Sequence, residues 1–542
     1  KQRYEARERG DLIEIGIAPK NAGGTADYRN YISLEFSYDA AESEILLAFE
    51  SKLNRKLTDD EAKEINERRQ SGLKDREWVT SPNRKWDNGG VSPYEGCYYS
   101  CEHLTFDLVP DYLRNNDLSD WIVTLQTADP GAYAHALARW HDTDSRAWLI
   151  TALIKAKRSS PNILALMRDA EVVARDAPEF PTIAHELVRL RIAFGKKEAA
   201  RNLIDEAISQ PSDRLPVSAM NQFLEQRAHI AETPAEFLKY SQRKPAAFYD
   251  YGRYGSLKDL LKIGKGSWDP DYSDQTKEEY EQEIESRYKD LLPWDDRFIL
   301  DDETVEILNW HFPLQSLVDA ARDRAVPSYL QRQMILAAWT RAILLQRDEL
   351  ALRIAPEVIR AAPEMTSVFG PYLQARTPVE RNHAALFVLL KFPNLSPFIA
   401  NGIPSFDTSE QLDYYFERAW WCALPTTEYD KGSHEVPKVV PKPDFLTGKQ
   451  LEAATTERNR LNVIGDGKRY LGNQVLQWAK TSPDDPRISE ALFIAFRANE
   501  SYKYGCGGWE HDGEIQGEAE TILRQRYPKS AWTAKLPKHE DQ

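Results

Sequence analysis

The first part of the chain contains two short segments in which apolar and polar residues alternate. They cover residues 11–17 and 31–38, and such alternation is typical of β-strands with one buried face. A charged run at 58–70 begins with Thr58-Asp-Asp-Glu61, which matches a capping box that satisfies free amides in the first turn of a helix. Residues 1–92 are therefore expected to form a mixed segment with a strand pair and one helix.

Beyond this segment, apolar residues recur at intervals of three and four, the pattern of amphipathic helices. The clearest unit has predicted helices at 181–194 and 198–210, with Gly195 in the turn between them. One helical pair cannot bury its own apolar face, so we expect the pairs to stack into an all-α solenoid. The predicted arrays cover residues 93–261, 301–424 and 451–542.

Two segments interrupt this pattern. One is an acidic insertion at 262–300, and the other is a proline-rich loop at 425–450. Long insertions in a repeat array are often binding loops on one face. A passive linker between two sub-arrays is the equal alternative.

The unit at 177–210 resembles a tetratricopeptide (TPR) repeat. Small, apolar and helix-ending residues fall where that family places them, although the early Trp and the usual Tyr of its first helix are missing; the matching residues are Ala184, Leu187, Gly195, Ala199, Ala207 and Pro211. Residues 95–535 also resemble uncharacterised bacterial helical-repeat proteins, in the segments 121–126, 134–140, 420–422, 485–492 and 504–506. The resemblance implies a TPR-like α-solenoid for this region and implies no activity. The expected fold is therefore an all-α, TPR-like helical hairpin solenoid that follows the small mixed segment of residues 1–92.

Charge and hydropathy narrow the choice of partners. The 542 residues include 85 acidic and 70 basic side chains, a formal net charge of -15. A protein that follows a phosphate backbone usually carries a basic stripe, so nucleic acid is not an expected partner. The longest apolar runs are far shorter than the roughly 18 residues that a membrane-spanning helix requires, so no membrane insertion is expected.

The chain has four cysteines, and we expect them to pair. Cys97 and Cys101 are close enough in sequence for a local bridge, and Cys422 is predicted to meet Cys506 in the C-terminal array. Four thiols would also permit a zinc site, but their spacing matches no strong zinc signature. We therefore predict no metal and no cofactor. Disulfides favour a periplasmic or secreted protein, with the cytoplasm as the alternative.

Motifs for catalysis are scarce. The loop at 505–514 gathers a thiol, an imidazole and three carboxylates, but an acidic loop before a helix would have the same composition. The chain contains no G-x-S-x-G, Walker or H-E-x-x-H motif. No catalytic residue is therefore assigned, and Trp509 and His511 of this loop are retained as binding candidates.

Aromatic residues supply the other binding candidates, which are Tyr251, Arg253, Tyr254, Trp420 and Trp421. Tyr, Trp and Arg are preferred anchors in protein interfaces, and aromatic rings also stack on sugars, which makes a glycan an additional candidate ligand. The leading hypothesis is a non-enzymatic protein-binding or scaffolding solenoid in a bacterial envelope or extracellular assembly. The alternative is a helical-barrel enzyme that acts on polysaccharide through paired carboxylates, about 5 to 9.5 Å apart in an aromatic cleft.

Overall fold

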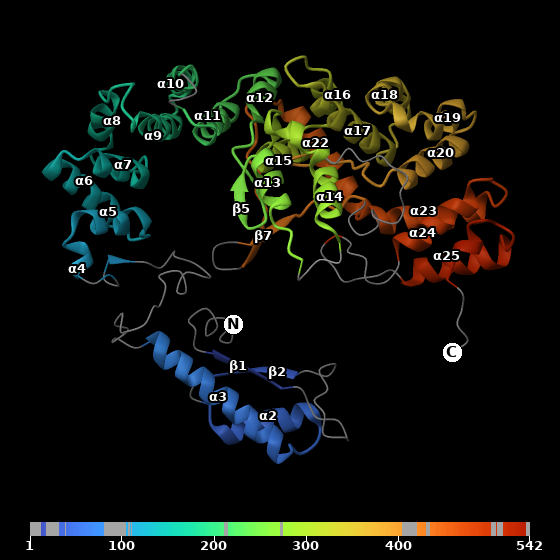
Figure 1. Ribbon diagram of the computed structural model, residues 1–542, viewed down its shortest axis with the longest axis horizontal. Coiled ribbons are helices and arrows are strands. Elements are labelled where there is room, and N and C mark those ends of the chain that lie inside the picture. Colours follow the sequence, from blue (N-terminus) through green and yellow to red (C-terminus); the bar gives the residue numbers. More distant parts are fainter. Residues whose placement is uncertain are drawn as a thin grey trace. The chain divides into compact units, whose positions relative to one another are not determined.

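The computed structural model describes two compact units of the chain (Figure 1). The smaller comprises Lys1–Leu108 and Gln126–Ala128, and the larger Val109–Leu125 and Asp129–Gln542. The described residues are 12–17, 32–37, 40–80, 105–106, 109, 111–210, 215–270, 275–403, 420–429, 434–499, 506 and 513–537.

The smaller unit pairs two strands and packs helices beside them. Strands β1 (Leu12–Ile17) and β2 (Ile32–Ser37) are antiparallel. Alternate β2 residues meet a core from helices α2 (Glu42–Leu53) and α3 (Asp59–Thr80); this core contains Ile32, Leu34, Phe36, Ile45, Phe49 and Ile65. The predicted capping box is confirmed, because the Thr58 amide donates to Glu61 Oε2 at 3.0 Å and the Glu61 amide donates to Thr58 Oγ1 at 3.3 Å.

The first half of the larger unit is a succession of short helices that pack mainly against their neighbours in sequence. Its helices are α4 (Asp111–Arg114), α5 (Asp117–Gln126), α6 (Ala132–Thr143), α7 (Arg146–Lys155), α8 (Ile163–Glu171), α9 (Phe180–Ala193), α10 (Lys197–Ile208), α11 (Val217–His229) and α12 (Pro234–Tyr240). The predicted pair at 181–210 is confirmed as α9 and α10. Gly195 between them has a φ of +75°, which glycine adopts without strain.

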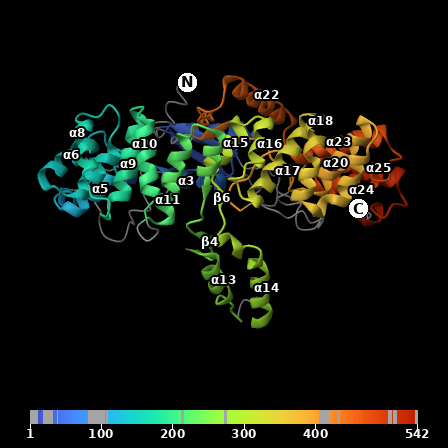
Figure 2. The same cartoon turned by 90° about the horizontal axis from the view of Figure 1, so that it is seen from above.

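An excursion of the chain, residues 244–298, leaves this succession and returns to it. At its base, β3 (Gln242–Arg243) pairs with β6 (Ile299–Leu300). The excursion, named here the arm, holds the hairpin of β4 (Phe248–Asp250) and β5 (Arg253–Gly255), helices α13 (Leu257–Lys265) and α14 (Lys277–Lys289), and the turn η5 (Leu292–Asp295). Figure 2 shows α13 and α14 standing out together from the row of helices.

The arm has a small apolar core of its own. Its buried members come from α13, α14 and η5, and they are Leu257, Leu260, Ile284, Tyr288 and Trp294. Thr276 and Glu279 form a capping box at the start of α14. The acidic insertion predicted at 262–300 therefore holds α14 and η5, which share a core with α13, and α13 begins before the predicted range.

The second half of the larger unit resumes the succession of packed helices. Its elements are α15 (Asp302–His311), α16 (Leu314–Ala321), α17 (Ser328–Leu344), α18 (Asp348–Ala361), η6 (Pro363–Met365), α19 (Thr366–Gln374), α20 (Pro378–Lys391), β7 (Thr427–Tyr429), β8 (Glu435–Pro437), α22 (Gly448–Ile464), α23 (Gly467–Thr481), α24 (Ile488–Ala498), α25 (Gly513–Arg526) and η7 (Thr533–Lys535). The described chain is mostly helical, as the all-α prediction requires. None of the helices in the described ranges combines the length and apolar character that crossing a membrane demands.

Two large apolar cores run through the larger unit, and they meet around α11 and α12. The first gathers buried residues between Tyr133 and Ile230, and the second gathers those between Ala228 and Leu536. Ile208 packs against both. We call this meeting place the junction, because the arm begins immediately after it.

Candidate functional site

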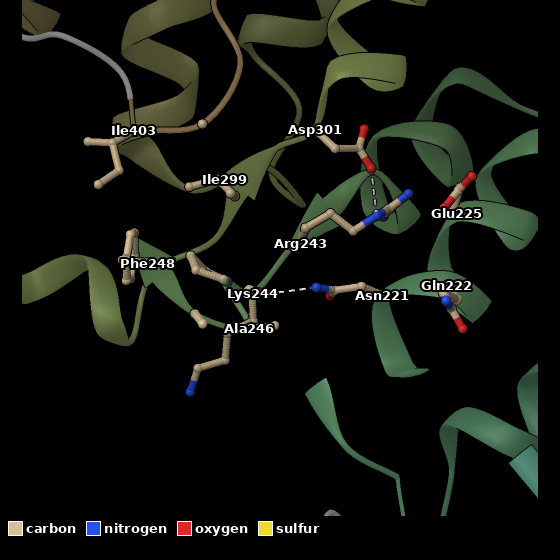
Figure 3. A pocket seen from close by; sticks show the side chains of 13 residues that line it. Asn221, Gln222, Glu225, Arg243, Lys244, Ala246, Phe248, Ile299, Asp301 and Ile403 are labelled. Carbon is tan, nitrogen blue, oxygen red and sulfur yellow. Dashed lines mark hydrogen bonds and ion pairs between the residues drawn. The ribbon is translucent and has the colours of Figure 1, made fainter. Parts of the chain in front are cut away.

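An open cavity of about 430 Å³ lies at the junction. We name it the junction pocket (Figure 3). Its wall comes from α11, from the segment that starts with β3, from the start of α15 and from a short piece of chain after α20. The lining residues are Asn221, Gln222, Glu225, Arg243, Lys244, Pro245, Ala246, Ala247, Phe248, Ile299, Asp301, Gly402 and Ile403.

Helix α11 presents one polar row to this region and an apolar surface to the cores. Asn221, Glu225 and His229 follow one another at intervals of four, so they lie on one face of the helix. Phe223 and Ala228 lie on other faces and are buried. The same helix therefore closes the core and supplies the polar wall of the pocket.

Arg243 and Asp301 are brought together by the pairing of β3 with β6. Asp301 is the N-cap of α15, and one of its oxygens accepts from the Thr304 amide at 2.8 Å. Its other oxygen lies 2.8 Å from Nε of Arg243, whose side chain is only 6% exposed. The guanidinium also donates to the Tyr240 carbonyl. The buried cation is therefore fixed in place at the back of the pocket.

Beside this pair lies a second set of ionisable groups. His229 Nε2 is 2.5 Å from Glu303 Oε1, with the two side chains 35% and 32% exposed. Glu225, one turn before His229 on α11, interacts electrostatically with both His229 and Glu303. We name Glu225, His229, Arg243, Asp301 and Glu303 the junction cluster.

Contacts within the cluster shift its pKa values in opposite directions. Burial, followed by the charge and hydrogen bond of Glu303, raises the pKa of Glu225. The hydrogen bond with His229 lowers the pKa of Glu303, and the same bond raises the pKa of His229. Burial lowers the pKa of Arg243. The neighbouring carboxyl groups of Glu225 and Glu303 disfavour ionisation of both, and Glu225 is the one whose neutral form is favoured.

Asn221 adds an unused acceptor to the wall. Its Nδ2 donates to the Lys244 carbonyl at 2.8 Å, which fixes the orientation of the amide. Its Oδ1 is buried and has no hydrogen-bond partner within the described part of the chain. Buried polar atoms are nearly always paired in folded proteins. A ligand that donates a hydrogen bond would satisfy this atom.

The predicted binding residues of the arm lie on the hairpin that begins at the pocket. Phe248 of β4 lines the pocket, and Tyr249 is the next residue along the strand. Tyr249 and Tyr254 are paired across the hairpin with ring centroids 4.8 Å apart and are 63% and 78% exposed. Arg253 is also exposed.

Tyr251 differs from its neighbours in the hairpin, because it is only partly exposed and packs inside the arm. A Cβ on Gly264 would lie 2.9 Å from its ring. Tyr251 has a φ of 49° in the turn between the strands. Of the three predicted hairpin residues, Arg253 and Tyr254 are thus on the surface and Tyr251 supports the fold.

Trp420 and Trp421 lie in the second core, only 8% and 4% exposed. The indole N–H of Trp420 donates to the Leu389 carbonyl at 3.1 Å, and that of Trp421 donates to the Gly465 carbonyl at 3.0 Å. These rings leave little surface for a partner, and their contacts are structural.

The predicted pairing of Cys422 with Cys506 is present as a disulfide. Asp466 lies close to both sulfurs, so that three residues with metal-ligating atoms come together, but the sulfurs are bonded to each other. Cys97, Cys101, Trp509 and His511 lie outside the described residues.

Sequence reasoning did not identify the junction cluster. Its members come from α11, β3 and the start of α15, and about 80 residues separate the first from the last. Only the four-residue spacing of Asn221, Glu225 and His229 was visible as a polar face on a helix. Comparison with known proteins adds no further assignment, since no family model, curated protein or solved structure matches the chain.

Proposed function

We propose that this chain is a non-enzymatic, TPR-like α-solenoid that binds a segment of another protein at the junction pocket. The observation that carries the proposal is the open cavity of about 430 Å³ beside α11, whose wall combines apolar side chains with the polar and charged groups of Asn221, Glu225 and Arg243. Stacked helical units present extended surfaces that suit peptide recognition. The exposed Tyr249, Arg253 and Tyr254 near the pocket supply residue types that are frequent in protein interfaces.

The geometry favours binding over polysaccharide hydrolysis. Glycosidase carboxyl groups are about 5 to 9.5 Å apart, which leaves room for a nucleophilic attack or for a water molecule. The carboxylates that line the pocket are Glu225 and Asp301, and Asp301 is already engaged by Arg243 and by the Thr304 amide. Of the residues that line the pocket, only Phe248 is aromatic. A sugar-binding cleft normally offers more aromatic surface than this.

A periplasmic or secreted location in a bacterium is part of the same proposal. Its support is the disulfide between Cys422 and Cys506, since such bonds persist mainly in oxidising compartments. A partner in the cell envelope or an extracellular assembly would share that compartment.

Site-specific photo-cross-linking tests the proposal. A photoreactive amino acid replaces Ala246, an exposed residue at the pocket, and in a control protein it replaces Val172, which is 84% exposed at the end of α8. Each protein is irradiated in an extract of the cells that produce it, and mass spectrometry locates the cross-links. A third protein combines the Ala246 probe with Gln222→Trp, which fills the pocket.

The proposal expects the Ala246 probe to join one recurrent segment of one partner. That product should be absent with the Val172 probe and strongly reduced by Gln222→Trp. Equal labelling from both positions, or labelling that ignores Gln222→Trp, would contradict a binding site at the pocket. Release of sugar fragments from polysaccharide by the purified protein would instead support the hydrolase alternative.

A further inference from the structure

We propose that the junction pocket accepts a basic side chain, an arginine or lysine of the bound segment, against Glu225 and Asn221. This inference rests on the proposed function and adds the chemical class that the pocket selects. It concerns a part of the wall where acceptors remain after the internal ion pairs have formed.

The hydrogen-bond inventory of the wall calls for donors from a ligand. Arg243 and Asp301 satisfy each other, and His229 and Glu303 do the same. The Glu225 carboxyl and the unpaired Oδ1 of Asn221 remain, one helical turn apart on α11. A guanidinium carries five N–H donors and no acceptor, and an ammonium carries three donors, so either group matches such a wall.

The charges of the cluster also favour a cation. Three carboxyl groups, those of Glu225, Asp301 and Glu303, face two basic groups, those of Arg243 and His229. With all five groups ionised, the cluster has a net charge of −1. An anion would meet this surplus of carboxylates, whereas a cation would be attracted to the Glu225 carboxylate.

The charge of the whole chain also favours the binding of a basic segment. The chain has a formal net charge of -15, so a basic segment is attracted toward it from a distance. Lys244, another basic residue of the pocket wall, lies 3.4 Å from Asp296, which offsets its charge. The cavity is also open to solvent, so a long side chain can enter while its backbone stays at the surface.

Proton exchange gives the inference a specific signature. Glu225 is faced by Glu303 of α15, Arg243 of β3 and His229 of its own helix. A bound cation stabilises the ionised form of Glu225, so binding should release a proton and strengthen as the pH rises through the raised pKa of this group.

The test uses small probes on the full chain, because it then requires no identified partner. Ligand-observed saturation-transfer NMR measures the binding of n-butylguanidinium, n-butylammonium, neutral butyramide and anionic butyrate. The variants are Glu225→Gln, which keeps the shape of the side chain, and Glu278→Gln, an exposed glutamate of α14 that serves as a matched control. N-acetyl-arginine amide and spermidine are then compared at the same site.

We expect the two cations to bind saturably and the neutral and anionic probes to bind far more weakly. Glu225→Gln should weaken the cations by about tenfold or more, the loss expected when a charge-assisted hydrogen bond is removed. Glu278→Gln should leave them unchanged. Equal binding of butyrate, or equal affinity of the wild type and Glu225→Gln, would overturn the inference.

The comparison of sources decides between a peptide and a free amine. If the pocket binds an arginine or lysine side chain of a peptide, N-acetyl-arginine amide should bind at least as tightly as spermidine. Much tighter binding of spermidine would overturn that assignment in favour of a polyamine. The result is separable from the photo-cross-linking, since a failed cation titration leaves the Ala246 cross-link standing, and a failed cross-link leaves the cation site standing.

Discussion

Removing the buried guanidinium of Arg243 should weaken the junction measurably. In Arg243→Met the side chain keeps an apolar stem of similar length but loses its bonds to Asp301, at 2.8 Å, and to the Tyr240 carbonyl. Each charge-assisted bond contributes about 1.5–3 kcal/mol, so the gross loss is about 3–6 kcal/mol. Relief of the desolvation of a buried charge opposes this loss. Asp301 is 30% exposed, so water partly replaces its partner.

The net expectation is a loss of about 1–3 kcal/mol in the free energy of unfolding. Urea-induced unfolding followed by tryptophan fluorescence measures it, with Arg253→Met, a change at an exposed arginine of β5, as the control. The control should stay within about 0.5 kcal/mol of the wild type. Identical midpoints for Arg243→Met and Arg253→Met would refute the view that this cation organises the junction.

Three further changes test other parts of the fold. The disulfide closes a separation of 84 residues, so replacing Cys422 and Cys506 by serine should cost about 4.5 kcal/mol on chain entropy, and an unchanged urea midpoint would contradict this. A methyl on Gly472 would lie 2.8 Å from a side-chain carbon of α25; Gly472→Ala should therefore lower stability by about 1–3 kcal/mol in urea unfolding, whereas Gly448→Ala, in open space, should not. The hydrogen bond between His229 and Glu303 of α15 raises the pKa of the imidazole. This bond therefore stabilises the folded chain below about pH 6.5, and its contribution is lost as the pH rises through the raised pKa. Hydrogen exchange in α11 should become faster over that range, beyond its intrinsic pH dependence, and the effect should be smaller in His229→Gln.

The parts of the fold that could be predicted from the sequence are those that depend on short-range patterns. Helices α9 and α10 and the turn at Gly195 follow from spacing within 34 residues, and the capping box at Thr58 follows from four. The junction pocket does not follow in this way. It requires β3 to pair with β6 across the whole arm, and residues this far apart carry no periodicity that links them.

The tandem tryptophans show where residue type alone misleads. Trp is frequent in protein interfaces, which made Trp420 and Trp421 binding candidates. Trp420 instead has a φ of 66° and follows no helical path, so the two side chains leave the backbone toward different neighbours. Both are therefore buried, one donating to the end of α20 and the other to Gly465 before α23.

Hydrogen–deuterium exchange of the full chain, with and without the partner identified by cross-linking, tests the central claim most directly. Binding at the junction pocket predicts slower exchange in residues 217–229, 242–248 and 299–303, with α8 and α18 unaffected. Protection confined to other helices, with no change in those three segments, would contradict the account.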